Sequence, residues 1–223
     1  MADLIETLRT TGAVREFLPD PVPDDVVARI LDTARFAPSG GNRQGWHVVV
    51  VKDAAKRRAL RDLYLPGWYE YLAMRAAGLT PWAPVTDREK EGEAIAAAKP
   101  IVTGFPEHLD EVPVLLVLFA DLRALAAIDR DGDRYQFAGG ASVYPFAWNL
   151  LLAARDEGLG GVITTVVIRE EHAVKALFDA PDELAVAAVI ALGKPVKQPR
   201  RLTRASVDQF TTVDSLTGSA FPS

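Results

Sequence analysis

The chain contains no cysteine among its 223 residues. This absence excludes disulfides, thiolate metal sites, iron–sulfur clusters and cysteine nucleophiles, and it fits a reducing compartment. Histidine is also scarce, and His47, His108 and His172 share no spacing typical of a metal site. The sequence therefore predicts neither a metal centre nor a thiol-based mechanism.

Long hydrophobic runs are missing as well. The longest, Val112 to Ala120, contains Pro113 and suits a buried strand, because it is far too short to span a membrane. The first residues mix acidic with apolar side chains and do not resemble a secretory signal. The net charge of −5 offers no basis for binding nucleic acid or an anionic membrane. We expect a cytoplasmic protein with neither partner.

The composition is that of a folded globular protein, with 49% hydrophobic and 25% charged residues. A chain of 223 residues is near the upper range of one compact domain. No internal repeat or linker interrupts it. We therefore expect one domain over residues 1–223, with its least constrained part, a helical excursion, around 64–112.

Hydrophobic periodicity predicts alternating helices and strands, hence a three-layer α/β (α+β) domain. The expected helices cover residues 26–34, 53–64, 68–77, 143–157 and 170–178, and the expected strands cover 46–51, 114–120, 162–168 and 184–192. Asp24 is well placed to cap the first helix. Pro145 must lie in the first turn of its helix or kink it. From Pro195 onward the chain is expected to be extended and basic.

Three motifs suggest chemistry but fail on inspection. Gly158 to Gly161 follows a helix and precedes a strand, the reverse of a dinucleotide-binding turn. Asp129 to Asp133 starts like a calcium loop but lacks the glycine and glutamate that such a loop needs. Gly140 to Tyr144 lacks the final glycine of a nucleophile elbow. The sequence therefore offers no nucleophile and no phosphate-binding turn of these types.

The most informative stretch runs from Ala37 to Trp46, between an amphipathic helix and a buried strand. Gly40 and Gly41 permit close approach of the backbone to a ligand, while Ser39, Asn42 and Gln44 supply hydrogen-bond donors and acceptors. This composition favours a loop that closes on a flat ligand with polar edges. An ordinary turn after a helix would also explain it.

Arg15, the proline-punctuated residues 19–24, a helix and then A-P-S-G-G-N-x-Q-x-W occur in an order and spacing that resemble the flavin-dependent nitroreductase family. The resemblance extends more weakly to residues 149–154, 158–160, 192–195 and the basic tail. It implies a nitroreductase-like fold, with a central mixed sheet flanked by helices and an extended C-terminal tail. It also implies FMN as cofactor and an obligate homodimer with two sites across the interface.

The resemblance assigns roles to individual residues. Arg15 would contact the ribityl and N1–C2 region of the flavin, although a surface salt bridge with Glu16 is the alternative. The loop residues that would line the flavin ring are Pro38, Ser39, Gly40 and Asn42, beside Gln44. Thr164 and Thr165 occupy the place that faces flavin N5 in relatives. The phosphate candidates in the tail are Arg200, Arg201 and Arg204, of which Arg201 and Arg204 are preferred; a solvated basic face is the alternative.

Three places depart from the family pattern, and one is Ile163-Thr164-Thr165, where relatives tend to present small residues, or an acid and a glycine, near flavin N5. Residues 10–13, Thr-Thr-Gly-Ala, stand where relatives often carry a basic residue, so Arg9, the tail or the threonine hydroxyls would have to replace one cation. Gly45 stands where proline is common, which leaves the loop less rigid. These changes concern affinity and substrate choice more than the fold.

The resemblance implies an FMN-dependent oxidoreductase that takes hydride from NAD(P)H and reduces electron-poor acceptors such as nitroaromatics, quinones or activated alkenes, by a ping-pong mechanism. No protein side chain would be catalytic, since the flavin carries the chemistry. The alternatives are a flavin-dependent dehydrogenase or dehalogenase on the same scaffold, and a non-catalytic protein that binds or sequesters flavin. The aromatic residues available to stack a planar acceptor, or to fill the core or an interface, are Trp68, Tyr69, Tyr71, Trp82, Tyr135, Phe137 and Tyr144.

Overall fold

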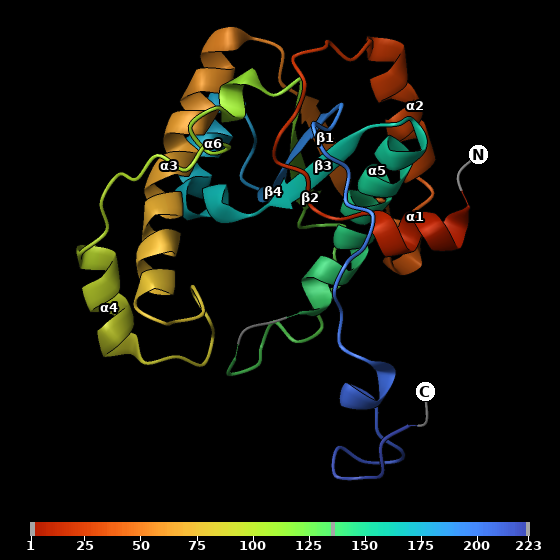
Figure 1. The fold of residues 1–223 in the computed structure, drawn as a ribbon. Helices are drawn as coiled ribbons and strands as arrows, with labels where there is room; N and C mark the ends of the chain where they lie inside the picture. The colour runs from red at the N-terminus through yellow and green to blue at the C-terminus, as the bar shows by residue number, and fades with distance from the viewer. Residues whose placement is uncertain (1–2, 135–136, 222–223) are drawn as a thin grey trace.

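The computed structural model describes residues 3–134 and 137–221, and at its centre is a four-stranded sheet (Figure 1). The order in the sheet is β1 (Trp46–Val50), β2 (Val114–Asp121), β4 (Leu184–Gly193) and β3 (Gly160–Thr164). All neighbouring strands are antiparallel. Among the described residues, the parallel component of the expected mixed sheet is reduced to one isolated bridge between Ala13 and Gly161, because β4 lies between β2 and β3, which run in the same direction.

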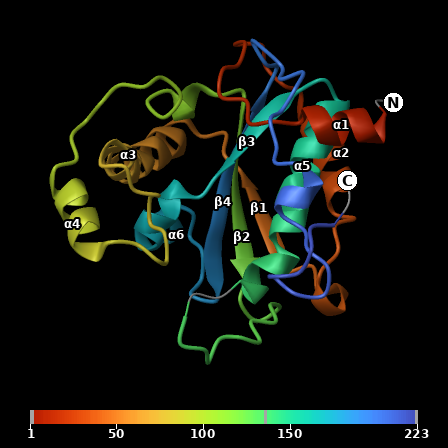
Figure 2. The same cartoon turned by 60° about the horizontal axis from the view of Figure 1, so that its bottom comes forward.

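Helices cover both faces of the sheet (Figure 2). The helices are α1 (Leu4–Thr10), α2 (Asp24–Ala34), α3 (Ala54–Ala76), α4 (Arg88–Ala96), α5 (Tyr144–Asp156) and α6 (Glu171–Leu177). In Figure 2, α3 and α6 lie on one side of the sheet, and α1, α2 and α5 on the other. The expected three-layer architecture is therefore confirmed.

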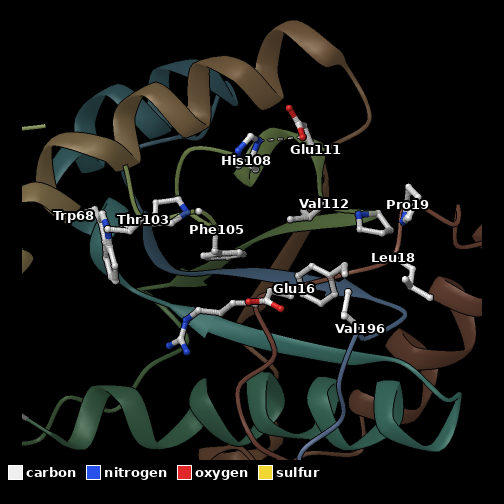
Figure 3. Close-up of a pocket in the computed structure, with 15 residues that line it drawn as sticks. Glu16, Leu18, Pro19, Trp68, Thr103, Phe105, His108, Glu111, Val112 and Val196 are labelled. Atoms are coloured by element: carbon white, nitrogen blue, oxygen red, sulfur yellow. Dashed lines mark hydrogen bonds and ion pairs between the residues drawn. The ribbon is translucent and has the colours of Figure 1, made fainter. Parts of the chain in front are cut away.

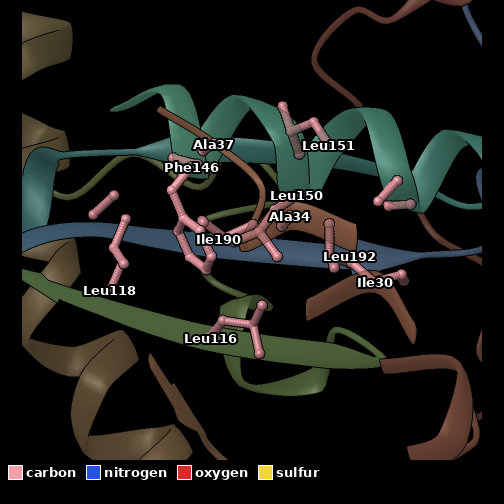
Figure 4. Close-up of a cluster of buried hydrophobic side chains, with 14 of the residues drawn as sticks. Ile30, Ala34, Ala37, Leu116, Leu118, Phe146, Leu150, Leu151, Ile190 and Leu192 are labelled. Carbon is pink, nitrogen blue, oxygen red and sulfur yellow. The ribbon is translucent and has the colours of Figure 1, made fainter. Parts of the chain in front are cut away.

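The side chains of β2 alternate between two hydrophobic cores. Leu116 and Leu118 pack with Phe146 and Leu150 of α5 in one core (Figure 4). The side chains between them belong to the second core, under α3 and α6. Because successive residues of a strand point to opposite faces, one continuous apolar run supplies both cores.

Helix α3 differs from the sequence expectation of two helices separated near Pro66. It is one helix of 23 residues, and Pro66 lies inside it. Asp53 caps its start by accepting a hydrogen bond from the backbone nitrogen of Lys56. A proline removes one helical hydrogen bond, but packing holds the helix together: at Gly67 an added Cβ would lie 2.9 Å from Val166 Cγ1.

Two further expectations are wrong in detail. The strand expected over 162–168 ends at Thr164, and Val166–Glu170 forms a 3₁₀ helix against α3, because tertiary packing overrides the β propensity of its branched residues. Asp24 does not cap α2: it is the first helical residue, follows Pro23 and pairs with Lys52. Pro145 does lie in the first turn of α5, as expected.

The C-terminal residues extend away from the sheet, as the blue end of the chain in Figure 1 shows. A single short 3₁₀ helix, Val207–Gln209, interrupts the tail between Val196 and Phe221. Within the part of the chain that the structure describes, no helix is long and apolar enough to cross a membrane.

Candidate functional site

The loop before β1 has a defined backbone conformation. Gly41, Asn42 and Gln44 have φ values of 62°, 52° and 49°, in the left-handed region that glycine and asparagine tolerate best. The backbone nitrogen of Gln44 donates to Ser39 Oγ at 3.0 Å, and its side-chain amide donates to Asn42 Oδ1 at 3.1 Å. Apart from half-buried Ser39, residues 38–44 are exposed. The loop is therefore held by hydrogen bonds among its own residues, and most of its side chains are exposed to solvent.

The N-terminal segment that carries Arg15 lies at the other edge of the sheet. Val14 donates a backbone hydrogen bond of 2.9 Å to Gly161 of β3, and Val196 of the tail donates one of 3.0 Å to Glu16. The side chain of Arg15 is exposed. No ion pair joins it to Glu16 within residues 3–134 and 137–221, so the salt bridge considered as an alternative is not formed.

Tyr64 is hydrogen-bonded to Thr164, and the positive charge of Arg15 acts on its phenol. The Tyr64 hydroxyl lies 3.0 Å from Thr164 Oγ1 at the end of β3. Burial raises the pKa of the Tyr64 phenol above its usual value, while the hydrogen bond with Thr164 and the charge of Arg15 act in the opposite direction. The structure thus brings two hydroxyls together at β3, the edge strand beside which the Arg15 segment runs. Thr165 follows Thr164 directly and is exposed.

A cavity of about 650 Å³ opens beside Arg15 (Figure 3). Its walls are largely apolar and come from residues 16–19, from residues 103–113, from Trp68 of α3 and from Val196 of the tail. Trp68 Nε1 donates to Thr103 Oγ1 at 2.9 Å, which fixes the indole at the rim. A mostly apolar cavity with a few polar groups has the character of a small-molecule site.

The aromatic residues expected near a substrate are distributed over several places. Trp68 lines the cavity, and Tyr71 stacks on it with ring centroids 5.0 Å apart. Trp82 lies behind Tyr71, 6.1 Å between centroids, and Tyr69 faces a separate hollow between α3 and α4. The remaining aromatic residues are Phe137, which is exposed, Tyr144, which donates to Ala187 O at 3.2 Å, and Tyr135, which lies outside the described residues.

The arginines of the tail surround a second hollow, also of about 650 Å³, together with a cation of α1. Its lining includes Arg9, Arg200, Arg201 and Arg204. At Gly12 an added Cβ would lie 2.7 Å from Leu202 Cδ2, so the tail occupies the space of a larger side chain there. The hydroxyls of the two preceding threonines donate to carbonyl oxygens of α1.

The two halves of the expected site do not meet within one chain. Arg15 lies beside β3, the loop of residues 38–44 precedes β1, and these strands form opposite edges of the sheet. The structure therefore places the Arg15 segment and Thr164 on the same edge strand, and groups the tail arginines with Arg9, but it leaves the loop at the opposite edge.

Sequence reasoning missed Tyr64 in this cluster. The residue falls on the apolar side of its helix and is 2% exposed, so periodicity identifies it as core. A tyrosine in such a position usually finds a partner for its hydroxyl, and this was the available signal. The partner itself could not be foreseen, since Tyr64 and Thr164 are 100 residues apart.

Comparison with known proteins identifies relatives of the whole fold. The chain is 29% identical over 212 residues to an NADH dehydrogenase of Thermus thermophilus, with 83% of each protein covered. It is 31% identical over 182 residues to a 5,6-dimethylbenzimidazole synthase of Rhodospirillum rubrum, with 82% of this chain and 77% of the synthase covered.

A solved structure shares the fold. It is an oxidized iodotyrosine deiodinase bound to FMN and 3-iodo-L-tyrosine, with a TM-score of 0.65 and 24% identity. The match covers 92% of this chain and 96% of the deiodinase chain. The model of the nitroreductase family matches residues 8–194. The chain therefore belongs to the nitroreductase family.

Proposed function

We propose that this protein is an FMN-dependent oxidoreductase that takes hydride from NAD(P)H and reduces electron-poor acceptors such as nitroaromatics, quinones or activated alkenes. The observation that carries the proposal is an apolar cavity lined by Arg15 and Trp68, next to the hydrogen-bonded pair of Tyr64 and Thr164. A cation with an adjacent hydroxyl suits a ring whose edge is polar and gains negative charge on reduction. The relative named NADH dehydrogenase supports the choice of electron donor.

The residues present fit FMN at both of its ends. Arg15 and Thr164 would hold the polar edge of the ring, with Thr165 adjoining them. The hollow with Arg9, Arg201 and Arg204 would hold the phosphate, because guanidinium groups bind phosphate through charge-assisted hydrogen bonds. Leu202 of the tail lies beside Gly12, so the neighbouring tail arginines would replace the basic residue that relatives often carry there.

We further propose an obligate homodimer. Residues Pro38, Ser39, Gly40, Asn42 and Gln44 would complete the site of the partner subunit, since Arg15 and the loop lie at opposite edges of one sheet. In a dimer with two-fold symmetry every contact between the subunits occurs twice, so each dimer would carry two equal sites.

When bound, FMN supplies two-electron hydride chemistry, which no side chain of this protein can provide. The chain's own residues would bind the cofactor and orient the acceptor. Trp68 and Phe105 line the cavity and would offer aromatic surface to a planar acceptor. Arg15 stabilises negative charge that develops on the ring edge.

Steady-state kinetics test the proposal. Initial rates of NADH and NADPH oxidation should be measured with purified, FMN-loaded protein at several fixed concentrations of a quinone and of a nitroaromatic. Donor and acceptor that use the site in turn give parallel double-reciprocal lines. Intersecting lines would exclude the ping-pong scheme. Oxidation of neither nucleotide with any acceptor would favour a protein that only binds flavin.

A further inference from the structure

Tyr64 carries a buried hydroxyl to which the proposed function assigns no role. The residue is 2% exposed and projects from α3 onto the end of β3. Burying a hydroxyl costs free energy unless it is hydrogen-bonded, and Thr164 Oγ1 at 3.0 Å is the partner that the structure provides. A phenylalanine would fill the same core position without needing a partner. Packing alone therefore does not explain the hydroxyl.

The chemistry of the two hydroxyls decides which one donates. A phenol is more acidic than an aliphatic alcohol, with a pKa of about 10, so Tyr64 is the better donor. Burial raises the pKa of Tyr64 further, so the phenol keeps its proton at neutral pH. A threonine hydroxyl has one proton and two lone pairs, and when it accepts from Tyr64 its own proton turns elsewhere. Accepting one bond also makes it a stronger donor.

The surroundings hold Tyr64 in this orientation. Its ring stacks on Trp68 with centroids 6.2 Å apart, and Trp68 is itself anchored to Thr103. Thr164 is only half-buried, and the segment that carries Arg15 runs alongside β3, where Ala13 pairs with Gly161. A ligand with an acceptor edge in the cavity that Arg15 lines would be able to use the outward proton of Thr164 as well.

We infer that Tyr64 is a positioning residue whose hydroxyl orients the hydroxyl of Thr164 as a hydrogen-bond donor toward the ligand that binds beside Arg15. The inference rests on the proposed function, under which that ligand is the polar edge of FMN. Arg15 would supply positive charge, and Thr164 would supply a second hydrogen bond to the same edge. Tyr64 determines that direction from behind, without contacting the ligand.

A double-mutant cycle on FMN binding tests this coupling. The dissociation constant of FMN should be measured with cofactor-stripped full-length protein for Tyr64→Phe, Thr164→Val and the double variant. The net free energy of one hydrogen bond corresponds to a change of about 5- to 10-fold in a dissociation constant, so Tyr64→Phe should raise the dissociation constant of FMN by that factor. In the Thr164→Val background the same substitution should change binding by less than about 2-fold, because the group it acts through is gone.

Two further variants sharpen the cycle. Thr164→Ser keeps the hydroxyl and should keep the sensitivity to Tyr64→Phe. Tyr69→Phe is the matched control, since it removes a tyrosine hydroxyl on the same helix that faces another hollow, and FMN binding should not change. An equal loss from Tyr64→Phe with and without Thr164 would show that Tyr64 acts through packing, and would overturn the inference.

A measurement without FMN separates this inference from the proposed function. With ¹³C-labelled tyrosine, the Tyr64 resonance is identified by its loss in Tyr64→Phe. It should move in Thr164→Val and stay in place in Tyr69→Phe. A Tyr64 resonance unaffected by Thr164→Val would show that the pair is not formed, whatever the protein binds. The Tyr64 resonance could move in Thr164→Val as expected while the protein takes up no FMN. That result would reject the proposed function and the ligand part of the inference, but the hydrogen bond between Tyr64 and Thr164 would stand.

Discussion

The backbone nitrogen of Asp121 donates a hydrogen bond of 2.8 Å to the carbonyl oxygen of Gly45. The bond joins the end of β2 to the last residue of the loop before β1. On the other side of the loop, the nitrogen of Gly40 donates to Ser142 Oγ at 2.9 Å, ahead of α5. The loop is thus tied to the body of the molecule at both ends, which limits the ordering that ligand binding would require.

Gly45→Ala should destabilise the protein. An added Cβ at this position would lie 2.6 Å from Ala124 Cβ, so one of the two segments must move. Overpacking of this kind costs about 1–3 kcal/mol in the free energy of unfolding, measured by urea denaturation. The matched variant is Gly45→Ala with Ala124→Gly, which removes the clashing atom and should recover most of the loss. If the double variant does not regain stability, the backbone conformation at position 45 requires glycine, and the lack of room beside Ala124 is not the cause.

Stability should depend on pH through Asp121. Arg123 donates to both carboxylate oxygens, at 2.9 and 2.8 Å, and lowers the pKa of Asp121 to about 2. The unfolded pKa is about 3.9, so the stabilising contribution is complete above that value and is lost as pH falls toward 2. Asp121→Asn should therefore be less stable than the wild type at pH 7, and the difference should narrow between about pH 4 and pH 2.

Urea denaturation across this pH range provides the measurement, and an Arg123→Ala background provides the control. Without its partner arginine, the effect of Asp121→Asn should lose most of its pH dependence. A pH-dependent difference that persists without Arg123 would assign the low pKa to another group.

Arg15→Ala should weaken the retention of FMN and slow its reduction. A hydrogen bond to a charged group is worth about 1.5–3 kcal/mol, which corresponds to an increase of roughly 10- to 100-fold in the dissociation constant. Arg58→Ala is the control, because Arg58 is an exposed arginine of α3 that lines none of the hollows described. Full FMN occupancy and wild-type turnover in Arg15→Ala would show that its assigned role is wrong.

Mixed dimers should restore sites that neither variant forms alone. Arg15→Ala and Asn42→Ala change the two halves of the proposed composite site, which lie at opposite edges of the sheet. In a dimer with one chain of each, one site carries both changes and the other carries none. After random exchange, FMN binding should therefore return to about one quarter of the sites. If both groups served the same chain's site, mixing would restore nothing.

Backbone chemistry predicted several elements from the sequence. Pro145 had to lie in a first helical turn, and Gly158 ends the same helix with a φ of 78°. The apolar run over 114–120 was identified as a doubly buried strand, since its residues lie in both cores. Local rules were sufficient in these places because local sterics decide the outcome.

Other features depended on contacts that local rules do not contain. Helix α3 continues through Pro66 because the 3₁₀ helix Val166–Glu170 packs against Gly67, and the same packing takes Val166 out of the sheet. The Tyr64–Thr164 pair and the filling of the Gly12 site by Leu202 join residues far apart in the chain. The flavin roles given to Arg15, the loop and the tail arginines stay predictions, as does the assignment of residues 1–223 to one domain.

The most direct test of the central claim is a visible absorption spectrum of the purified protein, followed by anaerobic addition of NADPH and then NADH to the same cuvette. We predict a yellow flavin spectrum that bleaches with at least one of the two nucleotides. A flavin spectrum that neither nucleotide bleaches would contradict the oxidoreductase assignment and favour a flavin-binding protein. A colourless protein that takes up no added FMN would contradict the account as a whole.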